Sequence, residues 1–341
     1  MLVKDAGEFG LIGRIARMLP AAAAGVVVGV GDDVAVLDFS GPDYLLATCD
    51  VQAEGVHFLR ERITPYQLGR KTAAINISDI AAAGGAPLWA LVSLSLPAET
   101  AVDFVEELYR GMIDELEPVG AAIAGGNCSR LDSGVLIDFT LLGKVAPDHL
   151  MLRRGARPGD AVMLTGHPGE SRAGLELLTN PGLAVGKDAR ETVLARHLTP
   201  RARLAEGRAL ARSGFVRAMI DVSDGLLADL GHICGASGVG AQIDAADLPV
   251  SFAALEVAKA AGKELLDWML SGGEDYELLF AADPSAVSRV QKLVLDVSGA
   301  PCTQIGRITA ESGIIKVVAR DGGERTTRAD GQGWDHFSSQ K

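Results

Sequence analysis

Short apolar runs alternate along this chain with clusters of glycine, proline and acidic residues. The runs at residues 26–28, 34–37 and 44–47 have the length and the flanking turn residues of β-strands. A longer apolar segment follows Thr64-Pro65, which combines a capping hydroxyl with a first-turn proline, and it stops at Gly84-Gly85. The pattern therefore predicts three short strands followed by one long helix.

The rest of the first half continues this mixture. Apolar residues at helical spacing between Phe9 and Leu19 predict an earlier helix that ends at Pro20. A strand that begins at residue 121 is predicted to end in Gly125-Gly126-Asn127. The other predicted elements are strands at residues 89–96 and 135–145 and a helix at residues 99–117.

A charged segment rich in glycine and proline, residues 153–160, predicts a domain boundary. Beyond it, residues 218–220 predict a strand that leads into Asp221, and Ser223 is predicted to cap a helix that begins at Asp224. The other predicted elements are strands at residues 161–165 and 276–280 and helices near residues 170–178, 188–196 and 201–213.

These elements do not form a regular βαβ repeat. The mixture favours an α/β fold of the α+β type with two domains, residues 1–150 and residues 151–341, over a Rossmann fold or a barrel. A chain of 341 residues, 48% of them hydrophobic, is long enough to build two cores.

The charge balance and the cysteine content exclude several classes of protein. With 32 basic and 44 acidic residues the net charge is −12, which argues against a nucleic-acid-binding surface. The four cysteines are scattered, so neither a zinc site nor a disulfide framework is predicted. Charged residues come early at the N-terminus and no apolar run reaches the length of a membrane span. We therefore predict a soluble, cytoplasmic protein without membrane contact.

Two acid-rich runs, Gly31-Asp32-Asp33 and Asp221-Val222-Ser223-Asp224-Gly225, each follow a predicted strand. Carboxylates that lie together repel one another unless water or cations neutralise them. Oxygen ligands of this kind suit Mg²⁺, which completes its coordination with water and substrate phosphates. The acids therefore predict phosphate chemistry, with Asp50 at a strand end and Asp79 in the long helix as further candidates.

Each acidic run also has an ordinary structural interpretation. Gly31-Asp32-Asp33 and Gly125-Gly126-Asn127 can be simple tight turns. Ser223 and Asp224 can be no more than a helix cap with a first-turn acid, although that interpretation leaves Asp221 unexplained.

The isolated candidates are ambiguous in the same way. A lone histidine such as His57 is more often structural than catalytic. Trp334 either pins down the C-terminal tail or stacks on a flat ligand ring. Lys71 and Arg153 are candidate phosphate contacts or solvated surface charges.

Several familiar nucleotide-binding signatures are missing from the sequence. The chain has no P-loop, no Rossmann Gly-x-Gly-x-x-Gly run after the first strand and no protein-kinase catalytic loop. A phosphotransferase with this sequence must therefore rely on metal ions held by carboxylates.

Eight motifs follow one another along nearly the whole chain, and their joint order and spacing are far more specific than any one of them. They are Gly7-Glu8-Phe9-Gly10-Leu11-Ile12, Gly31-Asp32-Asp33, Thr48-Cys49-Asp50 with Glu54-Gly55-Val56-His57-Phe58, Asn76-Ile77-Ser78-Asp79-Ile80-Ala81, Gly125-Gly126-Asn127, Asp221-Val222-Ser223-Asp224-Gly225-Leu226, Ser271-Gly272-Gly273-Glu274-Asp275-Tyr276-Glu277-Leu278 and Gly333-Trp334-Asp335-His336-Phe337. In this order they resemble the thiamine-monophosphate kinase family, which belongs to a larger group with aminoimidazole ribonucleotide synthetase, selenophosphate synthetase and a hydrogenase-maturation protein.

The resemblance implies a two-domain aminoimidazole ribonucleotide synthetase-like fold and a homodimer. The N-terminal domain would bind ATP and Mg²⁺ and form the dimer, and the C-terminal domain would complete the active site. The implied activity is a phosphotransferase with a phosphate group as acceptor, in thiamine diphosphate biosynthesis: the γ-phosphoryl group of ATP passes directly to thiamine monophosphate. Several Mg²⁺ ions are expected, with K⁺ as a candidate monovalent ion.

The resemblance also assigns residues, none of them as a covalent nucleophile. The implied metal-site positions are Asp33, Thr48, Cys49, Asp50, Asp79, Asn127, Asp221 and Asp224. The implied ATP contacts are Tyr109, Gly126, Asn127, Arg153 and Ser223. The implied contacts to the thiamine substrate are His57, Glu274 and Trp334.

Two positions depart from the family pattern. Asn127 stands where many members carry Asp, so it can ligate a cation but brings no charge. Cys49 stands where a small hydroxyl residue is common, and a thiol is a poor Mg²⁺ ligand, so a metal contact there would use the backbone carbonyl. These departures keep open a non-catalytic nucleotide- or thiamine-phosphate-binding protein, and another ATP-dependent enzyme of the same superfamily is the second alternative.

Overall fold

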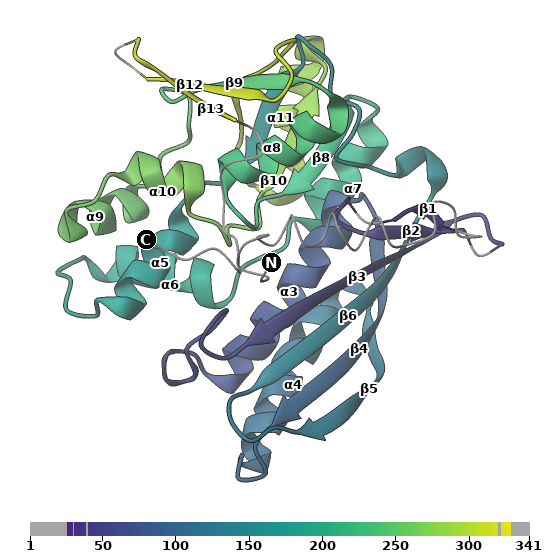
Figure 1. Cartoon of the computed structure of the whole chain (residues 1–341), viewed down its shortest axis with the longest axis vertical. Coiled ribbons are helices and arrows are strands. Elements are labelled where there is room, and N and C mark those ends of the chain that lie inside the picture. Colours follow the sequence, from purple (N-terminus) through teal and green to yellow (C-terminus); the bar gives the residue numbers. More distant parts are fainter. Residues whose placement is uncertain (1–25, 30, 39, 320–321, 329–341) are drawn as a thin grey trace, which may run out of the picture.

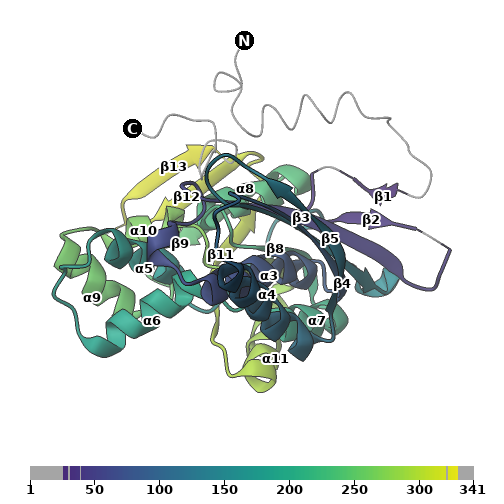
Figure 2. The same cartoon turned by 90° about the horizontal axis from the view of Figure 1, so that it is seen from below.

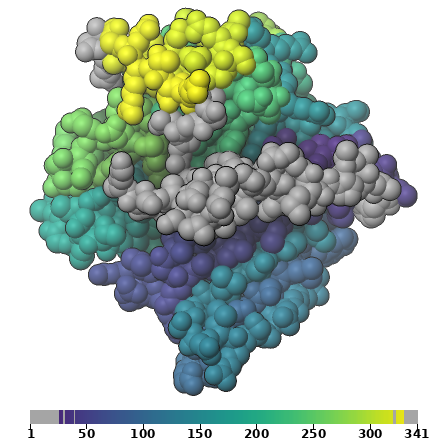
Figure 3. Space-filling view, in the orientation of Figure 1, coloured from purple at the N-terminus to yellow at the C-terminus, as the bar shows by residue number. Residues whose placement is uncertain are grey.

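The computed structural model describes residues 26–29, 31–38, 40–319 and 322–328 (Figure 1). These residues form two β-sheets covered by helices, one sheet from each half of the chain. In the space-filling view of Figure 3, the purple and blue first half lies below and the teal to yellow second half lies above. The predicted mixed α/β fold is confirmed, whereas the predicted division at residue 150 stays a prediction.

The first sheet has six strands in the order β1-β2-β3-β6-β4-β5. Neighbouring strands are antiparallel except β4 and β5, which are parallel. The strands are β1 (Val26–Val28), β2 (Ala35–Leu37), β3 (Tyr44–Ala53), β4 (Ala86–Leu96), β5 (Ala122–Arg130) and β6 (Leu136–Val145).

Alternation of side chains gives the first sheet a buried face and an open face. Phe139 and Leu141 are completely buried in the same core as residues of the long helix α3 (Pro65–Ala82). On the other face Trp89 and Leu91 are 50% and 44% exposed. One face of this sheet is therefore a core surface, and the other carries exposed apolar side chains that no described residue of the chain covers.

Helix α3 begins where the sequence predicts, because Thr64 and Gln67 form a reciprocal capping box. Helix α4 (Val102–Leu116) packs closely against it: a Cβ atom added to Gly69 would lie 1.9 Å from the carbonyl oxygen of Leu108. Figure 2 shows the strands of the first sheet curving around both helices. The two helices fill the hollow of the sheet.

The second sheet has seven strands in the order β13-β12-β9-β11-β7-β10-β8. All five residues of β7 are buried because helices cover both faces of this sheet. The strands are β7 (Ala161–Thr165), β8 (Val216–Asp221), β9 (Gly240–Asp244), β10 (Leu278–Ala282), β11 (Cys302–Thr309), β12 (Ile314–Val318) and β13 (Glu324–Arg328).

Two cores flank the second sheet. Val162 and Leu164 of β7 belong to one core, and Ala161 and Met163 belong to the other. The first core contains residues of helices α5 (Glu170–Thr179), α6 (Lys187–Leu198), α8 (Leu226–Ser237), α9 (Phe252–Ala261) and α10 (Leu265–Ser271). The second contains residues of helices α7 (Leu204–Ser213) and α11 (Val287–Ser298). Short 3₁₀ helices lie at Arg60–Arg62, Glu117–Val119, Pro147–His149 and Pro284–Ala286.

Helix α3 also contacts the second half of the chain. A Cβ atom on Gly207 of α7 would lie 2.2 Å from the carbonyl oxygen of Ala81, so the two helix backbones touch. Ser78 of α3 donates a hydrogen bond to Asp221, the last residue of β8, at 2.6 Å. The same helix therefore positions residues against both sheets. Within the described ranges, no helix combines the length and the apolar character needed to cross a membrane.

Several predicted boundaries were wrong. Asp50 lies inside β3, which continues to Ala53 because β6 pairs with it along its whole length. Asn127, with the two glycines before it, lies inside β5, since backbone pairing with β4 tolerates the glycines and carries the strand on to Arg130. The strand predicted to start at residue 276 begins at Leu278. The helix predicted before Pro20 lies outside the described residues.

Candidate active site

Three carboxylates from distant segments meet where the two halves of the chain face each other. Asp33 follows β1, Asp79 lies near the end of α3, and Asp221 ends β8. One oxygen from each carboxylate lies within 4.8 Å of the others. The acids that the sequence singled out on separate elements are thus brought into one cluster.

Each acid of the cluster is held by a neighbouring donor. Thr48 Oγ1 donates to Asp79 Oδ2 at 2.5 Å. Asp221 accepts from the Ser78 hydroxyl, as described above. Arg153 donates to Asp33 Oδ1 from Nε at 2.9 Å and from Nη2 at 2.5 Å. These contacts fix the carboxylates without neutralising all of their charge.

The cluster is electrostatically strained at neutral pH. Burial, together with the charge of Asp221, raises the pKa of Asp33 to about 7 in spite of Arg153. Burial raises the pKa of Asp221 to about 6, with Asp50 adding to the shift, and it raises the pKa of Asp79 well above its usual value. Converging oxygen atoms whose negative charge is not compensated fit a hard divalent cation such as Mg²⁺.

A fourth acid, Asp50, lies close to this cluster. Burial raises the pKa of Asp50 to about 6, and the charges of Asp224 and Asp33 add to the shift. Asp224 follows β8 and therefore links the cluster to the segment before α8. The predicted metal positions Asp33, Asp50, Asp79, Asp221 and Asp224 form one continuous acidic region.

The loop before α8 differs from the prediction. The helix begins at Leu226, and Gly225 rather than Ser223 occupies its N-cap position. Asp229, in the first turns of α8, instead accepts the backbone N–H groups of Ser223, Asp224 and Gly225 through its single oxygen Oδ2, at 3.1, 3.2 and 3.1 Å. An internal carboxylate thus takes three backbone donors of the kind that bind anions at a helix N-terminus.

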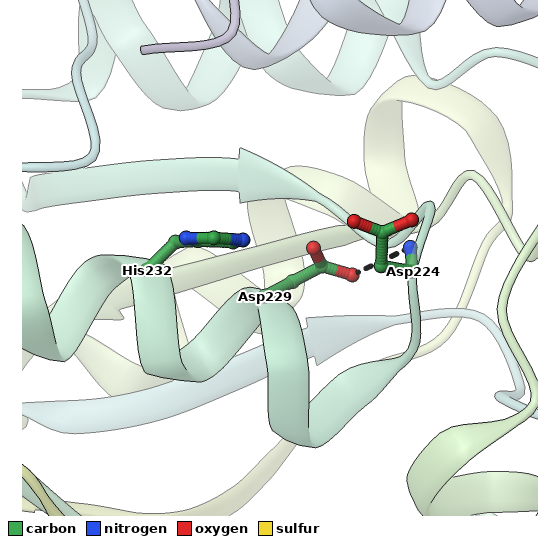
Figure 4. Close-up of side chains that lie close together, drawn as sticks. All are labelled: Asp224, Asp229 and His232. Carbon is green, nitrogen blue, oxygen red and sulfur yellow. Dashed lines mark hydrogen bonds between the residues drawn. The ribbon is translucent and has the colours of Figure 1, made fainter. Parts of the chain in front are cut away.

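Figure 4 shows Asp229 and His232 on the same side of α8, with Asp224 at the adjacent loop. Ligand atoms of these three residues lie within 4.8 Å of one another. Burial and the nearby Arg153 lower the pKa of His232 to about 4, so the imidazole is neutral at pH 7. Burial raises the pKa of Asp229 well above its usual value, but three N–H groups already occupy its oxygen Oδ2, so this side chain is better suited to holding the loop than to binding a cation.

A cavity of about 530 Å³ opens over the acidic cluster. Its volume falls in the range of small-molecule sites. Its polar lining comes from the following residues: Asp32, Asp33, Thr48, Cys49, Asp50, Asp79, Arg153, Asp221 and Ser223.

A second, smaller cavity of about 80 Å³ brings together other predicted residues. His57 and Glu274 line it, together with Arg62, Lys71, His197 and apolar side chains. Lys71 Nζ lies 2.7 Å from Glu274 Oε1, and the ammonium lowers the pKa of that carboxyl although burial opposes its ionisation. Two predicted substrate contacts therefore share one cavity.

Comparison with known proteins places this geometry in a family. The family model "AIR synthase related protein, N-terminal domain" matches residues 31–145, and the C-terminal domain model matches residues 157–318. The thiamine-monophosphate kinase of Escherichia coli (strain K12) is 37% identical over 338 residues, which cover 98% of this chain and 99% of the relative. The chain belongs to the thiamine-monophosphate kinase family.

Further members of the family are similar to this chain over its full length. The thiamine-monophosphate kinase of Aquifex aeolicus (strain VF5) is 36% identical over 341 residues, 99% of this chain and 100% of the relative. The solved structure of AaThiL complexed with AMPPCP and TMP superposes with a TM-score of 0.85 at 35% identity, covering 99% of each chain. The expected aminoimidazole ribonucleotide synthetase-like fold is thereby confirmed.

Some positions implied by the thiamine-monophosphate kinase resemblance lie away from the acidic cluster. Tyr109 is on α4, and Gly126 and Asn127 are on the edge strand β5, outside the lining of both cavities. The thiol of Cys49 donates to Asp138 Oδ1 at 3.1 Å on the open face of the sheet, so it points away from Asp79. Trp334 lies outside the described residues.

Four residues of this family member matter to the site and were missed by sequence reasoning. Ser78, Asp229 and His197 contact assigned side chains or the loop that carries them, and His232 has a ring nitrogen within 4.8 Å of a carboxylate oxygen of Asp224. Ser78 was recognisable as the neighbour of Asp79 within its motif, and Asp229 as an acid in the first turns of a helix. His197 had no local signal, because α6 reaches Glu274 only in the folded chain.

Proposed function

We propose that this protein transfers the γ-phosphoryl group of ATP to the phosphate of thiamine monophosphate, giving thiamine diphosphate and ADP. The observation that carries the proposal is the convergence of Asp33, Asp79 and Asp221 below a ligand-sized cavity. The full-length similarity to thiamine-monophosphate kinases and to AaThiL complexed with AMPPCP, an ATP analogue, and TMP supports the choice of substrates.

The acidic residues are suited to hold several Mg²⁺ ions. Asp33, Asp50, Asp79, Asp221 and Asp224 supply the carboxylates, while Thr48 and Ser78 orient two of them. The ions would neutralise the two phosphate groups and align them for in-line transfer. K⁺ is proposed only as a candidate monovalent ion.

The chain's own residues act by binding and alignment. An oxygen of the acceptor phosphate is the nucleophile, so the transfer needs no covalent intermediate on the protein. Arg153, paired with Asp33 in this structure, is positioned at the cavity to contact ATP phosphates once a cation takes over the charge of Asp33. Ser223 lines the same cavity. His57 and Glu274, with Trp334, are the proposed contacts to thiamine.

The position of Asn127 supports a homodimer. Strands β6 and β4 lie between β3 and β5, so roughly 14 Å separates the backbone of Asn127 from that of β3. Within one chain Asn127 and Gly126 are too distant to ligate a cation held by Asp50. A second copy packed on the open sheet face, where Trp89 and Leu91 are exposed, would supply Tyr109, Gly126 and Asn127 to the site.

The direct test is product formation. Purified protein incubated with thiamine monophosphate, ATP and Mg²⁺ should form thiamine diphosphate, measured by chromatography with fluorescence detection. Asp224→Asn should abolish formation while the circular dichroism spectrum stays unchanged. Ligand binding without product would support a non-catalytic binding protein, and trapping of a labelled phosphoenzyme from ATP would contradict direct transfer. A cytoplasmic location and the absence of nucleic-acid partners remain predictions.

A further inference from the structure

The turn that carries Glu274 has a strained backbone. Glu274 and Tyr276 adopt positive φ values of 54° and 50°, which residues other than glycine rarely adopt. The backbone N–H of Glu274 donates to Ser223 O at 2.7 Å, and that of Tyr276 donates to Val222 O at 2.8 Å. The fold therefore forces this turn to present the side chain of Glu274 at a set place.

The residue that receives Glu274 is a lysine with almost no contact to water. The side chain of Lys71, on α3, is 1% exposed, and its Nζ lies 2.7 Å from Glu274 Oε1. Burying an ammonium group is costly unless a carboxylate pairs with it. The pair joins the first half of the chain to the second and holds Oε1 in one orientation.

The second oxygen of Glu274 has a weaker partner. His197 Nδ1 lies 3.5 Å from Glu274 Oε2 and 3.1 Å from the hydroxyl of Ser171. Burial and Lys71 lower the pKa of His197 to about 3, so the ring is neutral and the 3.5 Å contact is not an ion pair. Oε2 therefore keeps acceptor capacity for a further donor.

The surroundings of Glu274 select the kind of donor. Apolar side chains of Phe58, Leu175, Leu178 and Leu198 line the same cavity, which suits a flat ring. The ammonium of Lys71 is 2.7 Å from the carboxylate and makes the pair neutral overall, and the basic residue Arg62 also lines the cavity, so the site does not attract the permanently cationic thiazolium ring. It favours the neutral aminopyrimidine ring, whose exocyclic amine is a hydrogen-bond donor.

We propose that Lys71 is a positioning residue that holds Glu274 as an oriented acceptor for the exocyclic amine of the aminopyrimidine ring of thiamine monophosphate. His197 of α6, which Ser171 of α5 contacts, lies beside the second oxygen. The proposal rests on the proposed function, because it assigns one ring of that substrate to the smaller cavity.

The first experiment replaces Lys71 by an apolar side chain of similar length. Lys71→Met should raise the KM for thiamine monophosphate about tenfold or more and leave the KM for ATP within about twofold. Lys71→Arg, which retains a positive charge, should recover part of the loss. Lys292→Met, at an exposed lysine paired with Asp296, is the matched control and should change neither constant.

The pH dependence of KM distinguishes a positioning role of Lys71 from a purely structural role. Lys71, His197 and His57 act on the charge of Glu274, and the basic residue Arg62 lines the same cavity. Without the Lys71 ammonium, burial raises the pKa of Glu274. In Lys71→Met the KM for thiamine monophosphate should therefore fall as pH rises from about 6 to about 8, whereas the wild-type KM stays flat. A flat profile in the variant would overturn the proposal.

A substrate analogue tests the recognised group without depending on the folding of a variant. Oxythiamine monophosphate carries an oxo group in place of the exocyclic amine. The wild type should use it with a kcat/KM at least about tenfold lower than that for thiamine monophosphate, and Glu274→Gln, whose amide can donate to the oxo group, should narrow this ratio. Equal use of both substrates by the wild type would overturn the proposal while the proposed kinase activity stands. Absence of thiamine diphosphate from thiamine monophosphate would instead overturn the proposed function.

Discussion

Asp33, Asp79 and Asp221 carry charges that destabilise the folded protein when no cation is present. The folded-state pKa values of Asp33, about 7, and Asp221, about 6, lie above the value of about 3.9 for an unfolded aspartate. The folded state therefore binds protons more tightly than the unfolded state. Their contribution to stability is greatest in acid and is lost as the pH rises from about 4 to about 7.

This loss of stability with rising pH predicts how the melting temperature depends on pH. In EDTA it should fall as the pH rises from about 5 to about 8, and Mg²⁺ should restore it, because a bound cation removes the repulsion. Asp221→Asn keeps the acceptor for Ser78 but removes one charge, so it should raise the melting temperature in EDTA at about pH 8 by about 2–4 °C. It should also weaken the response to Mg²⁺ in differential scanning fluorimetry.

The control for this prediction is Asp132→Asn, at a side chain that is 97% exposed. It should change neither the pH profile nor the response to Mg²⁺. A melting temperature of Asp221→Asn that is lower than the wild-type value at every pH would contradict the account of mutual repulsion.

The loop between β8 and α8 owes its shape to one element, the first turns of the helix. Asp229 collects three consecutive N–H groups and so fixes the direction of Asp224. Because the donors of this helix start are already occupied, the proposed function assigns the phosphate groups to cations and to Arg153 instead. The first turns of α8 therefore leave the positive charge of the proposed site to the bound cations and Arg153.

Replacing Asp229 should therefore affect both stability and the response to metal. Asp229→Leu leaves three N–H groups without a partner and should lower the free energy of unfolding by about 2–3 kcal/mol, measured by urea denaturation. The Mg²⁺ concentration for half-maximal activity should rise, since Asp224 loses its fixed position. Asp229→Asn retains an acceptor oxygen and should lose much less; equal losses in the two variants would contradict this role.

The close contact between α3 and α4 leads to a prediction about stability. Gly69→Ala would force the helices apart, because the added Cβ would lie 1.9 Å from Leu108 O. We expect a loss of about 2–3 kcal/mol in the free energy of unfolding. Gly235→Ala in α8, where no atom lies within 4 Å of the added Cβ, should instead be neutral or stabilise by up to about 1 kcal/mol. Destabilisation of both variants to the same extent would contradict the packing argument.

The molecule as a whole is organised around α3, which contributes Lys71, Ser78 and Asp79 to contacts with other elements. Both cavities lie along this helix, so phosphates and thiamine can be bound at two ends of one site. Within the described ranges, no segment of the chain covers the exposed Trp89 and Leu91 on the open face of the first sheet. The proposed dimer would cover this face.

A composite site across two subunits predicts recovery of activity on mixing. Asp79→Asn and Asn127→Leu should each be inactive as homodimers. Co-expressed, they should recover about a quarter of the wild-type activity, because half of the dimers are mixed and each mixed dimer holds one intact site. Asp79→Asn mixed with Asp221→Asn should recover none, since both residues belong to the same side of the site. Absence of recovery in the first mixture would contradict shared sites.

Local sequence patterns specified most of the elements but not all of their ends. The capping residues Thr64 and Gln67 indicate the start of α3, and the alternation of apolar and polar residues indicates β6. The continuation of β3 through Asp50 could not be read from propensity, because pairing with β6 keeps those residues extended. The cap of α8 was misassigned because Asp229 accepts the backbone N–H of Gly225, which a Ser223 cap would need.

The sequence by itself determined which side chains are available for chemistry, their family and the mixed fold, because residue types, motif order and periodicity are properties of the linear chain. The tertiary structure decided which of them meet. Ser78 and Asp221 are 143 positions apart, and only the packing of α3 against β8 brings them to 2.6 Å. The same packing buries Lys71 against Glu274, whereas strand order keeps Asn127 away from Asp50. Such contacts depend on long-range packing and strand order, which no local pattern encodes.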